Sequence, residues 1–180
     1  MDPLDAIEAE LNDATERARK LVEQVDGRRF TVRPDPSRWS AAECLAHLTI
    51  SAEEMLPALR EAIDKAPRGR KRRSPKMDWL GAFLRWFLEP PVRSRVKTAA
   101  RFVPRSVRAK AETLAEFVAF QQKLIETLHD AREVDLGAVR IVSPFDRRVK
   151  YNLYSAFRIV AAHERRHLWQ AEQAVAALSA

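Results

Sequence analysis

Residues 40–66 read SAAECLAHLTISAEEMLPALREAIDKA, and this stretch decides the fold class. Its apolar side chains recur at three- and four-residue steps, which is the spacing of one face of an α-helix. Ser40 and Glu43 form an S-x-x-E capping box, in which each side chain satisfies a backbone N–H group at the start of a helix. The stretch therefore predicts a long amphipathic helix that begins just after Ser40, and capping is a sufficient role for Glu43. The apolar face consists of Cys44, Leu48, Ala52, Met55, Leu59 and Ile63.

The same periodicity predicts three further long helices. Apolar faces of this kind run over residues 4–25, 114–128 and 153–178. Asp2 before Pro3 gives the first of these helices an N-cap and a proline at the first helical position. No stretch alternates apolar and polar residues convincingly, as a half-buried strand does. The prediction is an all-α protein, a four-helix bundle formed by a single domain over residues 1–180.

Length and cysteine content favour one domain in a reducing compartment. The chain has 180 residues and one cysteine, so it can bury a sizeable core and cannot form an intrachain disulfide. The first residues lack the apolar run of a signal peptide, and the longest strongly apolar stretch, 79–88, is broken by Arg85 and too short to span a bilayer. These features predict a cytoplasmic protein. We interpret Cys44 as a small core residue, in preference to a metal ligand or a reactive thiol.

Positive charge is concentrated in one segment. The formal net charge is +7, yet residues 67–110 carry 14 lysines and arginines against two acidic residues, a balance of +12. The rest of the chain balances at −5, so the helices are slightly acidic. Because this segment separates the second predicted long helix from the third, we interpret it as a long basic crossover with a short extra helix over residues 78–88.

Three of the four histidines are candidate metal ligands. His163 and His167 lie four residues apart on the fourth predicted helix, so both imidazoles project from one face, beside the apolar stripe. His47 lies at the shoulder of the apolar stripe of the second helix, and facing helices of a bundle can combine such ligands. Three neutral imidazoles leave coordination positions open, as in catalytic metal sites. From spacing alone, a hydrogen-bonded histidine pair in the core is an equally good interpretation of His163 and His167. The fourth histidine, His129, is better explained as a partner of a helix C-terminus.

Residues 163–167, HERRH, also match the H-E-x-x-H motif of zinc metalloproteases, in which the glutamate is the general base. Glu172 is the sole acidic residue or histidine after His167, so a third ligand downstream of the motif is cramped or missing. No strand is predicted that would bind a peptide. We therefore give a peptidase little weight.

Two segments together carry a family resemblance. Residues 39–48, WSAAECLAHL, are followed far downstream by residues 163–170, HERRHLWQ. This pair resembles the DinB-like family of metalloenzymes, whose fold is unrelated to that of the DNA polymerase sharing its name. The resemblance spans the whole chain and implies a four-helix bundle with a histidine triad. The matching positions here are His47, His163 and His167, and the resemblance favours metal binding over a purely structural cluster.

The resemblance implies a divalent-metal-dependent enzyme that acts on a small molecule. Some relatives are thiol S-transferases that use bacillithiol or mycothiol, and others are metal-dependent hydrolases, so a low-molecular-weight thiol is a candidate second cofactor. No residue decides between these two reactions. Imidazole nitrogen suits zinc, nickel, copper and iron, of which we expect zinc or nickel. Relatives often form homodimers, and the sequence leaves the oligomeric state open.

The basic crossover has three interpretations. One is an anchor for an anionic membrane, formed by the cations from Arg68 to Lys76 and by the aromatic residues Trp79, Phe83, Trp86 and Phe87. The same cations also suit nucleic-acid phosphates. We favour a third interpretation, in which its short helix covers one end of the bundle, because aromatic residues at helical spacing usually pack. The alternative function is a non-catalytic binding module that docks on nucleic acid or membrane. As a cover, the crossover would border the metal pocket, whose candidate substrate residues are Ser51, Gln170, Lys97 and Arg101.

Overall fold

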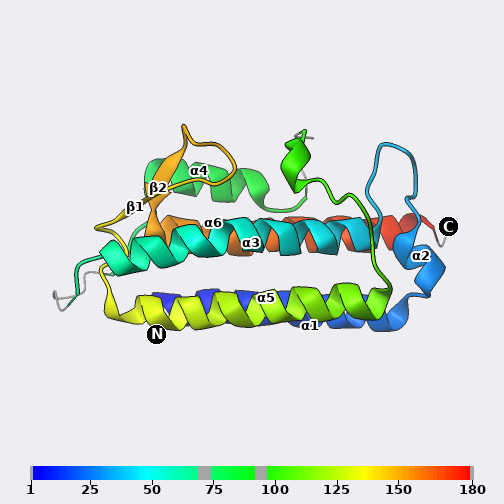
Figure 1. Ribbon diagram of the computed structural model, residues 1–180, viewed down its shortest axis with the longest axis horizontal. Helices are drawn as coiled ribbons and strands as arrows, with labels where there is room; N and C mark the ends of the chain where they lie inside the picture. The colour runs from blue at the N-terminus through cyan, green and yellow to red at the C-terminus, as the bar shows by residue number, and fades with distance from the viewer. Residues whose placement is uncertain (1, 69–73, 92–96, 179–180) are drawn as a thin grey trace.

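A computed structural model describes residues 2–68, 74–91 and 97–178 (Figure 1). About two thirds of the described residues are helical, in agreement with the predicted all-α class. Within the described ranges, the long helices are α1 (Pro3–Gln24), α3 (Ala41–Lys65), α5 (Lys110–Asp130) and α6 (Leu153–Ala177). The shorter elements are α2 (Gly27–Thr31), α4 (Trp79–Leu88) and the 3-10 turns η1 (Ala100–Phe102) and η2 (Ala131–Glu133).

Local sequence sets where the long helices begin. Asp2 and Asp5 form a reciprocal capping box at the start of α1. At the start of α3, Ser40 Oγ accepts a hydrogen bond from the Glu43 N–H at 3.2 Å, and Glu43 Oε2 accepts one from the Ser40 N–H at 2.9 Å. Each box satisfies N–H groups that have no partner within the helix. Glu43 therefore has the capping role that its spacing predicts.

The apolar faces of the long helices meet in the interior. α3 contacts α5 and α6, and α1 also contacts α5 and α6, so each long helix packs against two others. In Figure 1, α1 and α5 lie in the lower layer, and α3 and α6 lie in the upper one. The residues between the layers are buried and mostly aliphatic, which stabilises the fold through burial of apolar surface. The predicted face of α1 is part of this core at Leu4, Ile7, Leu11, Ala14 and Ala18.

A small antiparallel sheet corrects the expectation that the chain has no strand. β1 (Arg140–Val142) pairs with β2 (Lys150–Asn152), with Ile141 opposite Tyr151. Both side chains are buried and add to the core. Strands of three residues each are too short to show the period-2 pattern by which a strand is predicted. The pair forms part of the connection between α5 and α6.

The predicted short helix is present as α4, which contacts α6. α4 begins at Asp78, whose carboxylate accepts hydrogen bonds from the Gly81 N–H at 2.8 Å and from the Asn152 N–H at 2.7 Å. A side chain at Gly81 would overlap Ser155 of α6, so glycine permits the close approach of the two helices. These contacts hold α4 against α6.

The aromatic residues of α4 follow the packing prediction only in part. Phe87 is half-buried and lines an internal cavity. Trp79, Phe83 and Trp86 are instead exposed, so the expectation that they pack under a cover is wrong for these three. The reason is that α4 packs against α6 and β2, and the side that carries these three residues lies at the surface.

Part of the predicted basic crossover lies outside the described residues. Six of its lysines and arginines fall in the segments 69–73 and 92–96. Lys76, Lys97 and Arg101 are described. Of the helices that the structure describes, none combines the length and the apolar character needed to cross a membrane.

Candidate metal centre

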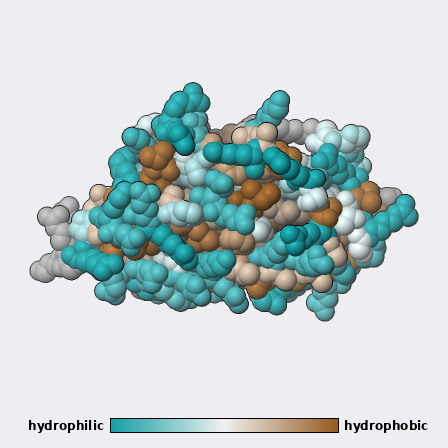
Figure 2. Space-filling view, viewed as in Figure 1, coloured by the Kyte–Doolittle hydropathy of each residue, from teal (hydrophilic) through white to brown (hydrophobic). Residues whose placement is uncertain are grey.

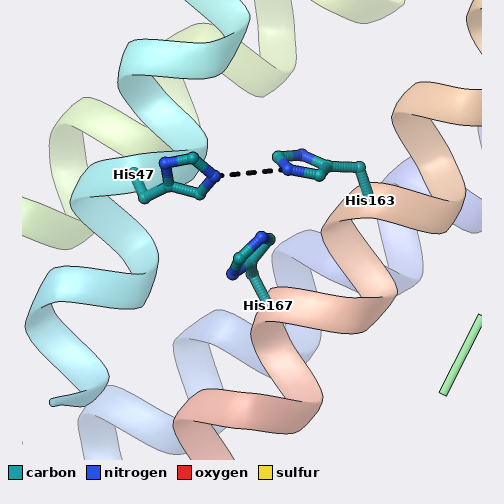
Figure 3. Close-up of side chains that lie close together, drawn as sticks. All are labelled: His47, His163 and His167. Carbon is teal, nitrogen blue, oxygen red and sulfur yellow. Dashed lines mark hydrogen bonds between the residues drawn. The ribbon is translucent and has the colours of Figure 1, made fainter. Parts of the chain in front are cut away.

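Three histidines from two helices converge on one point (Figure 3). His47 comes from α3, and His163 and His167 come from successive turns of α6. Their candidate ligand nitrogens all lie within 4.8 Å of one another, and His47 Nε2 is 3.2 Å from His163 Nε2. The structure thus brings together the three residues that the sequence predicts as metal ligands.

The backbone of η1 fixes the orientation of His47. His47 Nδ1 lies 2.8 Å from the carbonyl oxygen of Phe102, in η1. A carbonyl oxygen only accepts hydrogen bonds, so Nδ1 donates and the neutral ring carries its lone pair on Nε2. Figure 3 shows that this nitrogen faces His163. A carbonyl partner of this kind commonly holds a metal-binding imidazole in place.

The spacing of the histidine nitrogens suits a single metal ion. Two nitrogens bound to one tetrahedral zinc at ~2.0–2.1 Å lie about 3.3–3.4 Å apart. The 3.2 Å between His47 Nε2 and His163 Nε2 is close to this separation. Three protein nitrogens also leave at least one coordination position for water or substrate. The donor set therefore fits a divalent ion of the catalytic type.

Burial keeps the three imidazoles neutral. Burial lowers the pKa of His47, and the hydrogen bond to the Phe102 carbonyl only partly opposes this effect. Burial also places the pKa values of His163 and His167 well below the ordinary value, and the nearby charge of Arg166 acts in the same direction. Because protons compete with a metal for the same nitrogens, rings that are neutral at pH 7 favour metal binding.

The three histidines line a large cavity. Its volume is about 1150 Å³, and its walls come from α3, α4, α6, η1 and the connection between β1 and β2. Apolar side chains make up much of the lining, among them Met55, Leu84, Phe87, Phe102 and Phe145. Apolar walls with a few polar groups are typical of sites that bind small molecules.

Three of the four residues predicted for the substrate pocket line this cavity, namely Ser51, Gln170 and Lys97. Ser51 Oγ lies 3.5 Å from His47 Nε2. The structure places Arg101 elsewhere: its guanidinium donates a hydrogen bond to the Pro144 carbonyl and lies 4.8 Å from the centre of the Phe102 ring. Arg101 therefore supports the turn that carries the Phe102 carbonyl, and does not belong to the cavity lining.

Arg166 is a cavity residue that the sequence analysis missed. Its side chain is buried, and its guanidinium donates a hydrogen bond to the Phe87 carbonyl at 3.3 Å. Burial lowers the pKa of Arg166, but an arginine remains charged at pH 7. A residue three positions after His163 lies on the same side of a helix, so helical spacing offered a signal for it. Arg166 gives the cavity a fixed positive charge near the histidines.

Glu164, the glutamate of the H-E-x-x-H motif, is bound to α5. It is buried, and its Oε2 accepts a hydrogen bond from Gln121 Nε2 at 2.8 Å. Burial raises the pKa of the carboxyl to about 8, and the hydrogen bond from Gln121 only partly opposes this. The hydrogen bond ties this carboxyl to α5, whereas the glutamate of the peptidase motif acts as a general base. The third histidine of the cluster also comes from α3, and both departures argue against a peptidase.

Cys44 is buried as predicted. It packs in a core cluster with Leu48, Leu168 and, at the edge of the cluster, Trp39. Burial raises the pKa of its thiol, so the reactive thiolate is disfavoured. The packing role of Cys44 is sufficient to explain its position.

Fold and site together define a helical protein with a candidate three-histidine metal centre in the wall of a cavity. The chain belongs to the DinB superfamily, whose family model matches residues 10–171. The match begins in α1 and ends in α6, so it includes all three histidines. No curated protein and no solved structure matches the chain. The resemblance predicted from the two sequence segments is thereby confirmed.

Proposed function

We propose that the protein is a divalent-metal-dependent enzyme that acts on a small molecule by thiol S-transfer or hydrolysis. The observation that carries the proposal is the position of three neutral imidazoles at the wall of one large cavity. Membership of the DinB superfamily supports it. We also interpret α1, α3, α5 and α6 as a four-helix bundle, with α4 and η1 in its long crossover.

The residues of the site supply binding and orientation. His47 would be a ligand through Nε2, because the Phe102 carbonyl occupies Nδ1. His163 and His167 would be ligands held on the rigid scaffold of α6. A bound zinc or nickel ion would supply either a water of lowered pKa for hydrolysis or a site that stabilises the thiolate of a low-molecular-weight thiol.

The charges of the cavity favour an anionic substrate. Lys97 and Arg166 line the cavity. Of the two acidic residues in the lining, Asp146 pairs with Arg148 at 2.8 Å, and Glu164 accepts a hydrogen bond from Gln121 at 2.8 Å. The balance is positive even without a metal ion, and electropositive clefts concentrate anions. We therefore propose a small anion with an apolar body, whose charged group meets Lys97 or Arg166.

The proposed location is the cytoplasm, where the single free cysteine, Cys44, stays reduced. A homodimer and a nucleic-acid contact remain proposals made from the sequence. The second candidate function is that of a non-catalytic binding module. The exposed aromatic residues of α4 favour a module that binds a membrane over one that binds nucleic acid. Docking on a membrane and catalysis in the cavity are compatible, because they use different faces of α4.

Metal content tests the proposal. Protein purified without an affinity tag is expected to hold about one zinc or nickel ion per chain by elemental analysis. His47→Ala and His163→Ala each remove one ligand and should lower the affinity for the ion at least about tenfold. Equal metal content in these variants and the wild type would refute the proposed centre.

His129→Ala is the matched control for these variants. It removes a histidine that lies on α5 and pairs with Glu8 at 3.0 Å, away from the cluster, so its metal content should equal that of the wild type. Incubation with an electrophilic small molecule that carries a leaving group, with and without bacillithiol or mycothiol, then separates the two reactions. Metal-dependent consumption of the thiol supports S-transfer, and hydrolysis without thiol supports the alternative.

A further inference from the structure

We propose that the outward face of α4 docks on an anionic lipid surface. Three aromatic residues form this aromatic face: Trp79 is 81% exposed, Phe83 is 51% exposed and Trp86 is 54% exposed. Their spacing of four and three residues places them on one side of the helix. The ring centres of Phe83 and Trp86 lie 5.9 Å apart, so these two residues form one apolar surface.

α4 is apolar on two sides, an inner one and an outer one that carries the aromatic face. Leu84, Phe87 and Leu88 line the cavity on the inner side, where the helix also contacts α6. On the face of the molecule seen in Figure 2, hydrophobic residues occur in small separate groups among hydrophilic ones. Three large aromatic side chains on one side of a helix of ten residues are a denser apolar patch, of the kind that marks an interaction site.

Exposed cations border the aromatic face at the N-terminal end of α4. Lys76 precedes the helix, and Arg140 of β1 lies 3.7 Å from the Asp78 carboxylate that caps it. Arg140 also donates a hydrogen bond to the Lys150 carbonyl at 2.7 Å, which places β2 beside it. Lys76, Arg140 and Lys150 are all exposed, whereas Asp78 is largely buried by its hydrogen bonds. The border is therefore positively charged.

Tryptophan and phenylalanine beside exposed cations suit an anionic bilayer surface. Aromatic rings are favoured at the boundary between headgroups and acyl chains, where the indole N–H keeps a hydrogen-bond partner. Lysine and arginine beside them are attracted to anionic headgroups. The two observations, aromatic exposure and a positive border, thus point to one partner.

Two other partners fit this face less well. In a symmetric contact with the two α4 helices parallel, Lys76 and Arg140 of one copy would lie close to the same cations of the other. Single-stranded nucleic acid is bound where cations alternate with stacking rings. The one cation between Trp79 and Trp86 in the sequence is Arg85, which lies 3.4 Å from Glu89.

Vesicle flotation tests this inference, with vesicles of phosphatidylcholine alone and of phosphatidylcholine mixed with phosphatidylglycerol. The wild-type protein should float with the mixed vesicles, its tryptophan emission should shift to shorter wavelength, and added salt should weaken the binding. The double variant Trp79→Ser and Phe83→Ser should bind the mixed vesicles at least about tenfold more weakly than the wild type does. Lys76→Gln and Lys150→Gln should each weaken binding about fivefold and reduce its salt dependence.

Val32→Ser is the matched control, because Val32 is also an apolar side chain at the surface, 41% exposed. It directly follows α2, which lies at the opposite end of the molecule from β1 and β2 (Figure 1). Its binding should equal that of the wild type. Circular dichroism and metal content should be the same in all variants, which separates this test from that of the metal centre.

Three results would overturn the inference. The first is absence of flotation by the wild type, and the second is equal flotation by the Trp79→Ser and Phe83→Ser variant. The third combines two observations. The wild type does not float but forms a dimer or binds a single-stranded oligonucleotide, and the Trp79→Ser and Phe83→Ser variant loses that dimer or that binding. This last result would assign the aromatic face to self-association or to nucleic acid.

Discussion

α1 and α6 lie against each other, yet they bury different kinds of side chain. The buried residues of α1 are all apolar. α6 buries a serine, a glutamate, an arginine and a histidine along with its apolar residues, namely Ser155, Glu164, Arg166 and His167. Burial of polar groups costs free energy, so this difference between α6 and α1 marks where the fold serves a site more than its own stability.

Three of the four buried polar residues of α6 have side-chain hydrogen-bond partners. Glu164 accepts a hydrogen bond from Gln121, and Arg166 donates one to the Phe87 carbonyl. Ser155 Oγ accepts a hydrogen bond from the Asp78 N–H at 3.1 Å. These bonds offset much of the desolvation cost. The contrast between the two helices predicts that changes in α1 affect stability, and that changes in the histidine cluster affect metal binding.

The largest expected effect on stability is that of Leu11→Ala in α1. Leu11 is 1% exposed in the core, and truncation of a buried leucine costs about 2–5 kcal/mol in the free energy of unfolding. Urea denaturation measures this loss, with Val32→Ala as a surface control. Metal content at a temperature where the variant is folded should equal that of the wild type. Metal loss by the folded Leu11→Ala protein would show that the two helices do not divide these roles.

Metal removal should have the next largest effect. An ion that binds only the folded state adds about 2.7 kcal/mol to the free energy of unfolding when its free concentration is one hundred times its Kd. Chelation should remove this increment from the wild type and from Leu11→Ala. His163→Ala should show no increment at all, because one of its ligands is missing. An equal increment in His163→Ala would place the ion at another site.

The sequence contained enough information for the long helices and for most of the histidine cluster. Continuous apolar faces, the N-cap Asp2 before Pro3 and the capping box at Ser40 predict where α1 and α3 begin. The four-residue spacing of His163 and His167 predicts that they share a face, because that spacing is a property of any α-helix. His47 was a candidate by its place on the wheel, and the resemblance to the DinB-like family strengthened the assignment.

Other features of the site depend on tertiary contacts that no local pattern encodes. The partner of His47 Nδ1 is the backbone carbonyl of Phe102, and every residue has a carbonyl. The exposure of Trp79 depends on which side of α4 meets α6, and the aromatic spacing alone is equally compatible with packing. The placement of Arg101 outside the cavity depends on its bond to the Pro144 carbonyl. Each of these arises from segments distant in the chain.

The smallest effect is expected at the start of α3, where Glu43→Gln removes the carboxylate that accepts hydrogen bonds from the Ser40 N–H and from Arg33. Burial acts to raise the pKa of Glu43, but the hydrogen bonds from Arg33 and Ser40 outweigh it and the pKa is lowered. A carboxylate with a lowered folded-state pKa stabilises the protein above its unfolded pKa, and this contribution is lost as the pH falls through the folded value.

Glu43→Gln should therefore lower the free energy of unfolding by about 1 kcal/mol at pH 7, the usual contribution of a helix cap. The difference from the wild type should shrink below pH 4.5, the ordinary pKa of a glutamate. Thermal denaturation at several pH values measures it, and a difference that stays constant down to pH 3 would contradict the role of the charge. Glu61→Gln is the control, because Glu61 pairs with Lys65 on the exposed side of the same helix. His47 follows Glu43 by one helical turn. Metal affinity should nevertheless change little in Glu43→Gln, because the Phe102 carbonyl holds the His47 imidazole independently of the cap.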